Sequence, residues 1–551
     1  MSAHKRVLVV DDEDKILFVV RHALSRLSKN YQVETARNGQ QAIQMARATP
    51  FDLVVTDVRM PDGDGIALTE ALRELDPDPQ VIWMTAYHCG AHQAEMERLG
   101  VCCCLEKPIE IGEIRRVVGE ALRIKEGNEM QTYKYVIIGG GLAGGRACQG
   151  IRRLDKEGSV ALITSEAHVP YERPALSKGY LTGKEDLDHV YVKEAAYYEQ
   201  NQIDVLSGVA ATSIDRAAHK VTLGDGRELG YEKLLLATGG RAWRLPIPGA
   251  DLAGVYTLRT IENSDAIRDA VGTGTRALVL GGSFVGSEVA ASLAQLGAQV
   301  TMVFPESRLL ERVATEALSA HLGALYAGHG VRILSGTKPE RLEGADRVER
   351  AVLDNGETLE VDLVVMGVGI RLNTALAEAA GLEMWDNAAG RGDAVWVDER
   401  LRTSDPDIYA AGDIAAWPDP TFGKRLRVEH WDVAFRQGLR AGRNMAGEDK
   451  AYKTLPYFFS DLFDLSFEVW GDLTAWDQTV LRGSLPTPAD AGAGSYAVYY
   501  FDQGTLTGVL AAGRPKAERK PMPALVKARL GYTDVATKLA DEATDLSELA
   551  G

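Results

Sequence analysis

The sequence predicts an α/β protein with a doubly wound N-terminal domain, two Rossmann-type domains of which one is inserted in the other, and a C-terminal α+β domain. Residues 5–124 alternate short β-rich runs with amphipathic stretches of helical length, which is typical of a doubly wound parallel sheet. Two glycine-rich strand-to-helix turns follow, at 139–144 and 281–286. The chain of 551 residues is also too long for a single hydrophobic core.

The segments between these patterns set the expected domain boundaries. The hydrophobic period stops in the polar stretch KEGNEMQTY, where Gly127 and Asn128 break the helix. We therefore expect a first domain at residues 1–124 and a linker at 125–132. The second glycine-rich turn lies between two segments of the first Rossmann-type domain. The remaining expected domains are the first Rossmann-type domain at 133–262 and 386–452, the inserted one at 263–385, and the α+β domain at 453–551.

The composition argues against several classes of function. The formal net charge of -17 at pH 7 disfavours a nucleic-acid surface, because phosphates would be repelled. No apolar run approaches the roughly 20 residues that span a bilayer, and the N-terminus lacks the apolar stretch of a signal peptide. We expect a cytoplasmic protein without a membrane span.

The five cysteines form no CxxC or CxxxxC pair, so neither a zinc ribbon nor a redox-active dithiol is expected. The run Cys102–Cys104 is interpreted as a buried strand of small apolar residues, with a thiol sensor as the alternative.

In the first domain, polar side chains stand where the predicted parallel strands end. Asp11 and Asp12 follow the first strand, and Asp57 follows the third. Thr85 and Lys107 follow the fourth and fifth strands, and open α/β folds bind their ligands at this edge. Three converging carboxylates would repel one another unless a divalent cation binds, and hard oxygen ligands favour Mg²⁺. Asp57 could then attack a phosphoryl donor, while Lys107 and Thr85 contact the phosphate.

The motifs VLVVDDE, VVTDVRMPDGDG, MTA and LEKP resemble the receiver domains of two-component response regulators. The resemblance implies Mg²⁺ at Asp11, Asp12 and Asp57, and phosphorylation of Asp57 by a sensor histidine kinase. One departure is Cys104, where the family often has a switching Tyr or Phe. Two alternatives stay open: acidic residues that only cap a sheet edge, or a degenerate receiver.

The first glycine-rich turn has the features of a dinucleotide-binding loop. In YKYVIIGGGLAGGRAC a predicted strand leads through Gly139, Gly141 and Gly144 into a predicted helix. These glycines allow a tight turn and let the helix N-terminus face a pyrophosphate. Glu166 ends the next strand, where it can accept hydrogen bonds from a ribose.

The second turn repeats this unit with one change. Its loop consists of Gly281, Gly282, Ser283 and Gly286, with Ser283 in place of the middle glycine. Glu306 stands two residues past the usual position of the acid. An acid favours NADH, whereas the nearby Arg308 and Arg312 would suit the 2′-phosphate of NADPH, which is the less favoured cofactor.

Residues 133–515 resemble FAD-dependent pyridine nucleotide oxidoreductases, in the branch of ferredoxin or rubredoxin reductases and apoptosis-inducing-factor-like proteins. The resemblance rests on PYERPALSK, LLLATG, VMGVGIRLN, IYAAGDIA, RVEHWDVAFRQGLRAGRNMAG and FFSDL. Beyond the glycine loop, it implies FAD contacts at Arg173, Lys178, Val209, Thr238, Gly239, Arg259, Gly412, Asp413, His430 and Trp431. It implies nicotinamide dinucleotide contacts at Phe284, Val285, Gly367 and Glu429.

The same resemblance implies three catalytic residues. Lys178 would pair with Glu288 beside the flavin, and Phe284 would lie near the nicotinamide. A lysine there supplies positive charge to a flavin that gains electrons. A purely structural role stays open for three of the implied site residues: Lys178 as a solvated charge, Phe284 as a core packing residue and Trp431 as a core aromatic. Phe459 stands where the family commonly has Trp.

Together these features predict an FAD-dependent NADH oxidoreductase that passes hydride from NADH to flavin and then electrons to an external acceptor, under control of receiver phosphorylation. Cys148 stands alone, so the expected acceptor is a ferredoxin-like carrier protein, a quinone or oxygen. The alternative is a redox-sensing signalling module with low turnover, whose flavin state and Asp phosphorylation control oligomerisation or partner binding. A homodimer stays open, and a transcription regulator is disfavoured because no basic segment follows residue 125.

Overall fold

The computed structural model describes residues 5–25, 31–60, 65–75, 79–86, 93–107, 109, 113–114, 117–119, 121–122, 130–386, 394–486 and 494–550. The chain divides into two compact units, Met1–Met130 and Gln131–Gly551, and each is described by itself. Among the described residues, no helix is long and apolar enough to cross a lipid bilayer.

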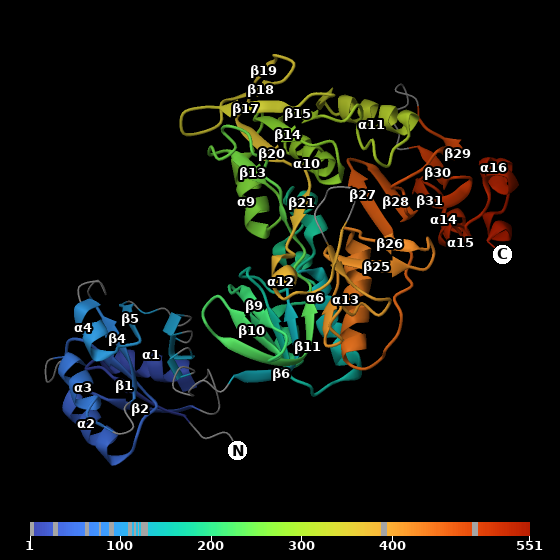
Figure 1. Cartoon of the computed structure of the whole chain (residues 1–551). Helices are drawn as coiled ribbons and strands as arrows, with labels where there is room; N and C mark the ends of the chain where they lie inside the picture. The colour runs from blue at the N-terminus through green and yellow to red at the C-terminus, as the bar shows by residue number, and fades with distance from the viewer. Residues whose placement is uncertain are drawn as a thin grey trace. The chain divides into compact units, whose positions relative to one another are not determined.

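The N-terminal unit is a five-stranded parallel sheet with helices packed on both faces (Figure 1). Across the sheet the strands are β2 (Tyr31–Ala36), β1 (Lys5–Val10), β3 (Leu53–Asp57), β4 (Gln80–Thr85) and β5 (Cys103–Glu106). The helices include α1 (Asp14–Ser25), α2 (Gly39–Ala48), α3 (Gly65–Leu72) and α4 (Gln93–Leu99). Since successive strand side chains point to opposite faces, Val7 packs in the core cluster of α1, and Leu8 packs in that of α2 and α3. The predicted doubly wound sheet is confirmed.

The run Cys102–Cys104 is less buried than we predicted. Cys102 is exposed, and Cys103 and Cys104 are half-buried. They lie at and just before β5, which is an edge strand and, among the described residues, has a neighbouring strand on one side only. The prediction of a buried strand was wrong, because small apolar residues do not by themselves distinguish a central strand from an edge strand.

The C-terminal unit begins with a seven-stranded sheet in the order β8-β7-β6-β11-β10-β9, with β24 paired to β11. Its strands are β6 (Gln131–Ile138), β7 (Val160–Ile163), β8 (Ile203–Leu206), β9 (Ala211–Asp215), β10 (Lys220–Leu223), β11 (Glu228–Leu236) and β24 (Ile408–Ala410). A parallel sheet follows in the order β13-β20-β14-β15-β16. Its strands are β13 (Val255–Thr257), β14 (Arg276–Leu280), β15 (Gln299–Phe304), β16 (Arg332–Ser335) and β20 (Leu363–Met366).

The chain leaves the first sheet after β11, builds the second sheet, and returns to the first with β24, where Leu234 pairs with Ile408. This order confirms the predicted insertion of one Rossmann-type domain in another, while the domain boundaries stay predictions. A two-stranded sheet of β12 (Gly240–Ala242) and β21 (Ile370–Leu372) joins the outgoing and returning segments.

The remaining elements before the C-terminal sheet are shorter, and several of them are labelled in Figure 1. The strands are β17 (Pro339–Glu343), β18 (Arg350–Leu353), β19 (Thr358–Glu360), β22 (Met384–Trp385), β23 (Ala394–Trp396), β25 (Ala415–Asp419) and β26 (Lys424–Leu426). The helices are η2 (Arg173–Ser177), α7 (Leu187–Val190), α8 (Ala195–Gln200), α9 (Ile261–Ala270), α11 (Glu316–Gly328) and α12 (Ala375–Ala379).

Two helices of the first Rossmann-type fold, α6 (Leu142–Leu154) and α13 (Trp431–Met445), pack unusually closely (Figure 1). A Cβ at Gly438 would lie 2.2 Å from the carbonyl oxygen of Ala143, and a Cβ at Gly442 would lie 2.1 Å from that of Ala147. Only glycine at these positions permits this approach. The packing fixes the start of α13, where His430 and Trp431 lie, against the first glycine-rich turn.

The C-terminal part is an antiparallel sheet in the order β27-β28-β31-β30-β29, followed by short helices, which confirms the predicted α+β class. The strands are β27 (Tyr457–Leu462), β28 (Leu465–Gly471), β29 (Gln478–Ser484), β30 (Ser495–Asp502) and β31 (Thr505–Ala512). The helices are α14 (Lys516–Arg519), α15 (Met522–Lys527), α16 (Tyr532–Ala540) and η3 (Leu546–Leu549). Phe458 and Phe467 of this sheet share a core cluster with residues of α10 (Phe284–Gln295), so the sheet packs against the inserted domain.

Candidate functional site

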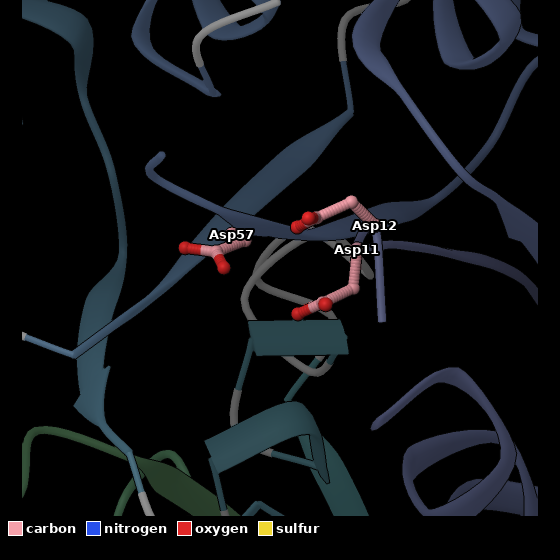
Figure 2. A group of neighbouring side chains, drawn as sticks. All are labelled: Asp11, Asp12 and Asp57. Atoms are coloured by element: carbon pink, nitrogen blue, oxygen red, sulfur yellow. The ribbon is translucent and has the colours of Figure 1, made fainter. Parts of the chain in front are cut away.

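In the N-terminal unit, the predicted acidic residues gather at the carboxyl ends of β1 and β3. Asp11, Asp12 and Asp57 each have a carboxylate oxygen within 4.8 Å of the others, and Figure 2 shows the three side chains together. Asp11 and Asp57 are buried, whereas Asp12 is exposed. This all-oxygen set has the chemistry that a hard divalent cation prefers.

Lys107 reaches into the same cluster from the end of β5. Its Nζ lies 2.8 Å from Asp11 Oδ2 and 2.5 Å from Asp57 Oδ2. Burial raises the pKa of Asp11 although Lys107 opposes the shift. Burial alone would lower the pKa of Lys107, but its hydrogen bonds to Asp11 and Asp57 outweigh this effect and raise it. Thr85 ends β4 beside them, and its carbonyl accepts a hydrogen bond from the Lys107 amide.

In the C-terminal unit, the first glycine-rich turn has the shape that a dinucleotide requires. Gly139 has a φ of 124°, and a Cβ there would lie 2.1 Å from the carbonyl oxygen of Ala237. A Cβ at Gly144 would lie 2.0 Å from the carbonyl oxygen of Gly139. At Gly141, the N-cap of α6, a Cβ would meet no atom within 4 Å. The turn is therefore closed where it packs on the sheet and open before the helix N-terminus, which fits a pyrophosphate.

The second turn has the same design. Gly281 has a φ of 121°, and a Cβ there would lie 2.4 Å from the carbonyl oxygen of Gly367. A Cβ at Gly286 would lie 2.2 Å from the carbonyl oxygen of Gly281. Ser283 is the N-cap of α10 but makes no capping bond, and its hydroxyl lies 3.4 Å from the carbonyl oxygen of Gly367. The serine that replaces a glycine is thus accommodated by turning toward the end of β20.

One large cleft of about 2220 Å³ joins the two turns. Every residue that we predicted for FAD, for the nicotinamide dinucleotide or for catalysis lines it, except Gly144 and Gly286. These two glycines instead pack each helix against its own loop. The structure thus brings the predicted residues to one place, and which cofactor atom each one contacts stays a prediction.

Beside the first turn, charged side chains form closed networks. Arg173 donates to Glu166 Oε1 at 2.7 Å and to the Tyr171 hydroxyl at 2.8 Å, and that hydroxyl in turn donates to Glu166. Arg259 donates to Asp413 Oδ2 at 2.9 Å. The donors and acceptors of this side are held in fixed positions by one another.

The predicted Lys178–Glu288 pair is present and buried. Lys178 Nζ lies 2.7 Å from Glu288 Oε1, and the Glu288 side chain is 8% exposed. Two hydroxyls that we did not predict complete the arrangement. Ser177 donates to Glu288 Oε2 at 2.6 Å, and Ser460 donates to Oε1 at 2.7 Å. Glu288 therefore receives two hydrogen bonds, from Ser177 in η2 and from Ser460 in β27, besides its ion pair with Lys178 at the end of η2.

Ser460 lies in the motif FFSDL, in which the sequence indicated a site role for position 459 only. A serine beside an unusual aromatic gives no sign of a partner 172 residues away. No sequence signal marked Ser177 or Ser460 as site residues, because a serine hydroxyl serves equally well in turns and caps.

Aromatic rings line the cleft between the two turns. His430 stacks on Phe458 with ring centroids 4.2 Å apart, and Phe458 meets Phe284 edge to face at 5.0 Å. Burial lowers the pKa of His430 to about 4, so its ring is neutral at pH 7. Trp431 donates from its indole nitrogen to Glu172 at 3.0 Å and contacts Phe459 edge to face. Trp431 is therefore anchored at the cleft rather than free to move.

Two predicted acids lie at the cleft in different settings. Glu429 is exposed and paired with Arg427 at 2.6 Å. Glu306 is half-buried, and in the described part of the chain it makes no side-chain hydrogen bond or ion pair. Arg312 lines the cleft too, whereas Arg308 lies outside its lining and faces Glu311 at 3.5 Å.

Comparison with known proteins agrees with this geometry. A family model of pyridine nucleotide-disulphide oxidoreductases matches residues 133–438, which is more than half of the chain. A response regulator receiver model matches residues 7–119, and a reductase C-terminal model matches residues 457–550.

The chain is 36% identical over 356 residues to the ferredoxin--NAD(+) reductase component of the anthranilate 1,2-dioxygenase system of Burkholderia cepacia, covering 64% of this chain and 86% of the relative. It is 31% identical over 420 residues to putidaredoxin reductase of Pseudomonas putida, covering 75% and 96% of the two chains. The crystal structure of the covalent putidaredoxin reductase–putidaredoxin complex superposes with a TM-score of 0.69 at 31% identity, over 76% of this chain and 98% of that chain.

These findings fix the class of chemistry. The chain is an FAD-dependent NADH oxidoreductase of ferredoxin-reductase type, fused to a response-regulator receiver domain. Residues 131–551 contain a single cysteine, Cys148, which is buried and free, so this unit has no redox-active disulfide. The chain belongs to the pyridine nucleotide-disulphide oxidoreductase family.

Proposed function

We propose that this protein uses NADH to reduce a small iron–sulfur electron-carrier protein, and that phosphorylation of Asp57 by a sensor histidine kinase regulates the rate. The observation that carries the proposal is the buried Lys178–Glu288 pair, which joins the segment after the first glycine-rich turn to the helix after the second. The names of the similar reductases support the choice of acceptor.

The open space before the α6 N-terminus and the Arg259–Asp413 pair suit FAD, which would supply two-electron uptake from NADH and one-electron release to the acceptor. Lys178 would hold a positive charge where electrons arrive, and Glu288 keeps that ammonium group in position. The rings of Phe284, Phe458 and the neutral His430 would exclude water from the cleft between the turns.

On the side of the second turn, Glu306 follows β15 and faces the cleft without an ion pair among the described residues. It would accept hydrogen bonds from an adenosine ribose and disfavour a 2′-phosphate. We therefore assign NADH as the preferred donor.

In the receiver, Asp11, Asp12 and Asp57 would hold Mg²⁺ through their carboxylate oxygens. Lys107 would neutralise charge on a phosphoryl group at Asp57 while it remains bonded to Asp11. Moving Lys107 from Asp57 to the phosphate would alter the end of β5, which is a local charge change of the kind that switches a domain.

The experiment reduces the purified full chain with NADH in the absence of oxygen and then mixes it with one acceptor at a time. The acceptors are a [2Fe–2S] ferredoxin, a soluble quinone and dioxygen. The proposal expects the ferredoxin to reoxidise the flavin fastest. Equal or faster reoxidation by the quinone would contradict it, and slow reoxidation by all three would favour a redox-sensing module.

The regulatory part is tested with beryllofluoride and Mg²⁺, which mimic a phosphoryl group on Asp57. The reoxidation or reduction rate is expected to change in the natural chain and not in Asp57→Asn, which lacks the accepting carboxylate. Identical rates with and without the mimic in the natural chain would contradict phosphorylation control and leave the reductase activity standing.

A further inference from the structure

Two arginines face each other in the small sheet that joins the two Rossmann-type folds. In the antiparallel pair of β12 and β21, Arg241 lies directly opposite Arg371. β12 follows β11, the strand after which the chain leaves the first sheet. β21 follows β20, which belongs to the second sheet. Each arginine therefore lies on one of the two segments that cross between the folds.

Neither arginine has an acidic partner in the part of the chain that the structure describes, although both are exposed and both line the cleft. Other arginines of this unit are paired, for example Arg173 with Glu166 and Arg276 with Asp362. Like charges directly opposite in an antiparallel pair repel each other. Two unpaired arginines side by side in a chain of net charge -17 therefore mark a place where an anion is expected to bind.

The position of Arg371 is also defined by a ring. Its guanidinium carbon lies 4.4 Å from the centre of the Trp243 ring, which is itself in the lining of the cleft. The Trp243 amide donates to the carbonyl oxygen of Gly369 at 2.9 Å, so ring and guanidinium are carried by the same pair of strands. This cation–π contact holds one arginine toward the cleft without neutralising it.

We propose that Arg241 and Arg371 form an anion site that binds the pyrophosphate of the incoming nicotinamide dinucleotide. The inference rests on the proposed NADH-dependent function and adds to it two recognition residues. Arginine is suited to this role because its planar group donates paired hydrogen bonds to phosphate oxygens.

The exchangeable dinucleotide fits this site better than FAD for two reasons. Exposed side chains are accessible to a ligand that enters and leaves, whereas the arginines beside the first turn, Arg173 and Arg259, are already bonded to acids. In addition, the segment that leads into β21 touches the second turn, since a Cβ at Gly367 would lie 2.8 Å from the Cα of Gly286. An anion held by both arginines would connect the two crossing segments.

The test uses the FAD-containing full chain and the double variant Arg241→Gln/Arg371→Gln. Calorimetric titration with NAD⁺, with ADP-ribose and with adenosine separates binding through phosphate from binding through the base. Two controls accompany it: Arg153→Gln removes an exposed arginine outside the cleft, and Arg241→Lys/Arg371→Lys keeps both charges. Flavin absorbance of each variant reports whether the fold and the first site are intact.

The double glutamine variant is expected to bind NAD⁺ and ADP-ribose about tenfold more weakly, because charge-assisted hydrogen bonds are lost, with a shallower dependence on salt. Adenosine binding, flavin content and the Arg153→Gln protein should be unchanged, and the lysine variant, which keeps the charges but loses the paired hydrogen bonds, should bind with an affinity between those of the natural chain and the glutamine variant. Unchanged NAD⁺ affinity in the glutamine variant would overturn the inference. Loss of flavin with NAD⁺ affinity retained would overturn it as well, because the anion would then belong to FAD.

A titration with inorganic pyrophosphate separates this inference from the proposed function. If the natural chain neither binds NAD⁺ nor is reduced by NADH, the proposed function fails. Pyrophosphate binding that is lost in the double glutamine variant would still support an anion site at the two arginines. Equal pyrophosphate binding by both proteins would overturn that site.

Discussion

The two glycine-rich turns of the C-terminal unit share one geometry. In each, the first glycine has a positive φ, 124° at Gly139 and 121° at Gly281. The last glycine of each turn packs on the carbonyl of the first, so that a Cβ would lie 2.0 Å from it at Gly144 and 2.2 Å from it at Gly286. The backbone thus builds the same pocket twice.

The surroundings of the two turns differ. The acid beside the first turn, Glu166, is bound by Tyr171 and Arg173, whereas Glu306 beside the second has no ion pair in the described part of the chain. Val285, at the start of the helix after the second turn, is 43% exposed. If the first turn binds the resident FAD and the second the exchangeable NADH, as we propose, the difference teaches that the neighbouring side chains, rather than the loop, separate the two kinds of site.

The largest expected effect comes from adding a methyl group to the last glycine of each turn. Gly144→Ala and Gly286→Ala each place a Cβ against a backbone carbonyl. This overpacking should lower the free energy of unfolding by about 2 kcal/mol. We expect Gly144→Ala to be purified without flavin, and Gly286→Ala to retain flavin that NADH no longer reduces. Flavin content and NADH-dependent bleaching check this.

The control for these variants is Gly323→Ala in α11, where a Cβ meets nothing within 4 Å. This variant should be as stable as the natural chain or slightly more stable, since alanine favours a helix. The assignment of different cofactors to the two turns would be contradicted if Gly144→Ala keeps its flavin, or if both turn variants lose it equally.

The next largest effect concerns Lys178, which connects the two sides. Lys178→Met leaves the Glu288 carboxylate buried without its cation, so we expect the rate of flavin reduction by NADH to fall about 100-fold. Stopped-flow absorbance measures this rate. Lys184→Met removes an exposed lysine of the same segment and should have no effect. If Lys178→Met is reduced by NADH as fast as the natural chain, the Lys178–Glu288 pair has no role in flavin reduction.

A smaller change is expected at Glu306, the acid that distinguishes the second site. Glu306→Ala removes the repulsion of a 2′-phosphate while Arg312 remains in the cleft lining. The preference for NADH over NADPH, measured as the ratio of their kcat/KM values, should fall about tenfold. Glu316→Ala, an exposed acid outside the cleft, serves as the control. An unchanged ratio would mean that a group other than Glu306 discriminates between NADH and NADPH.

The smallest effect is a pH dependence of stability from His430, which stacks between the two sides of the cleft. Its pKa is lowered by burial from 6.5 to about 4 in the folded chain. Between these values the unfolded chain binds the proton and the folded chain does not, so the free energy of unfolding falls as the pH falls from 6.5 toward 4. Urea unfolding across this range should show a flatter pH profile for His430→Gln. Parallel profiles for the two proteins would contradict a ring that stays neutral in the folded chain.

The parts of the site that the sequence predicts are those with local signals. Glycine spacing after a strand gave both turns, and the acids at strand ends gave the cluster of Asp11, Asp12 and Asp57. In each case one short segment carries both the residue type and its structural context.

The parts that could not be predicted depend on which distant segments meet. Ser460 reaches Glu288 only because β27 packs beside α10. The pairing of Arg241 with Arg371 requires the register of two strands, β12 and β21, that lie on the two segments joining the Rossmann-type folds. The exposure of Cys102 follows from the edge position of β5, which depends on the order of strands in the sheet. None of these is encoded in a local pattern.

The most direct test of the account is an anaerobic titration of the full chain with NADH, followed by visible absorbance and then by desalting. We predict that stoichiometric NADH bleaches the flavin, that the flavin remains with the protein, and that the nicotinamide nucleotide is removed. Absence of bleaching, or release of the flavin while the nicotinamide nucleotide stays bound, would contradict the assignment of a resident and an exchangeable site to the two turns.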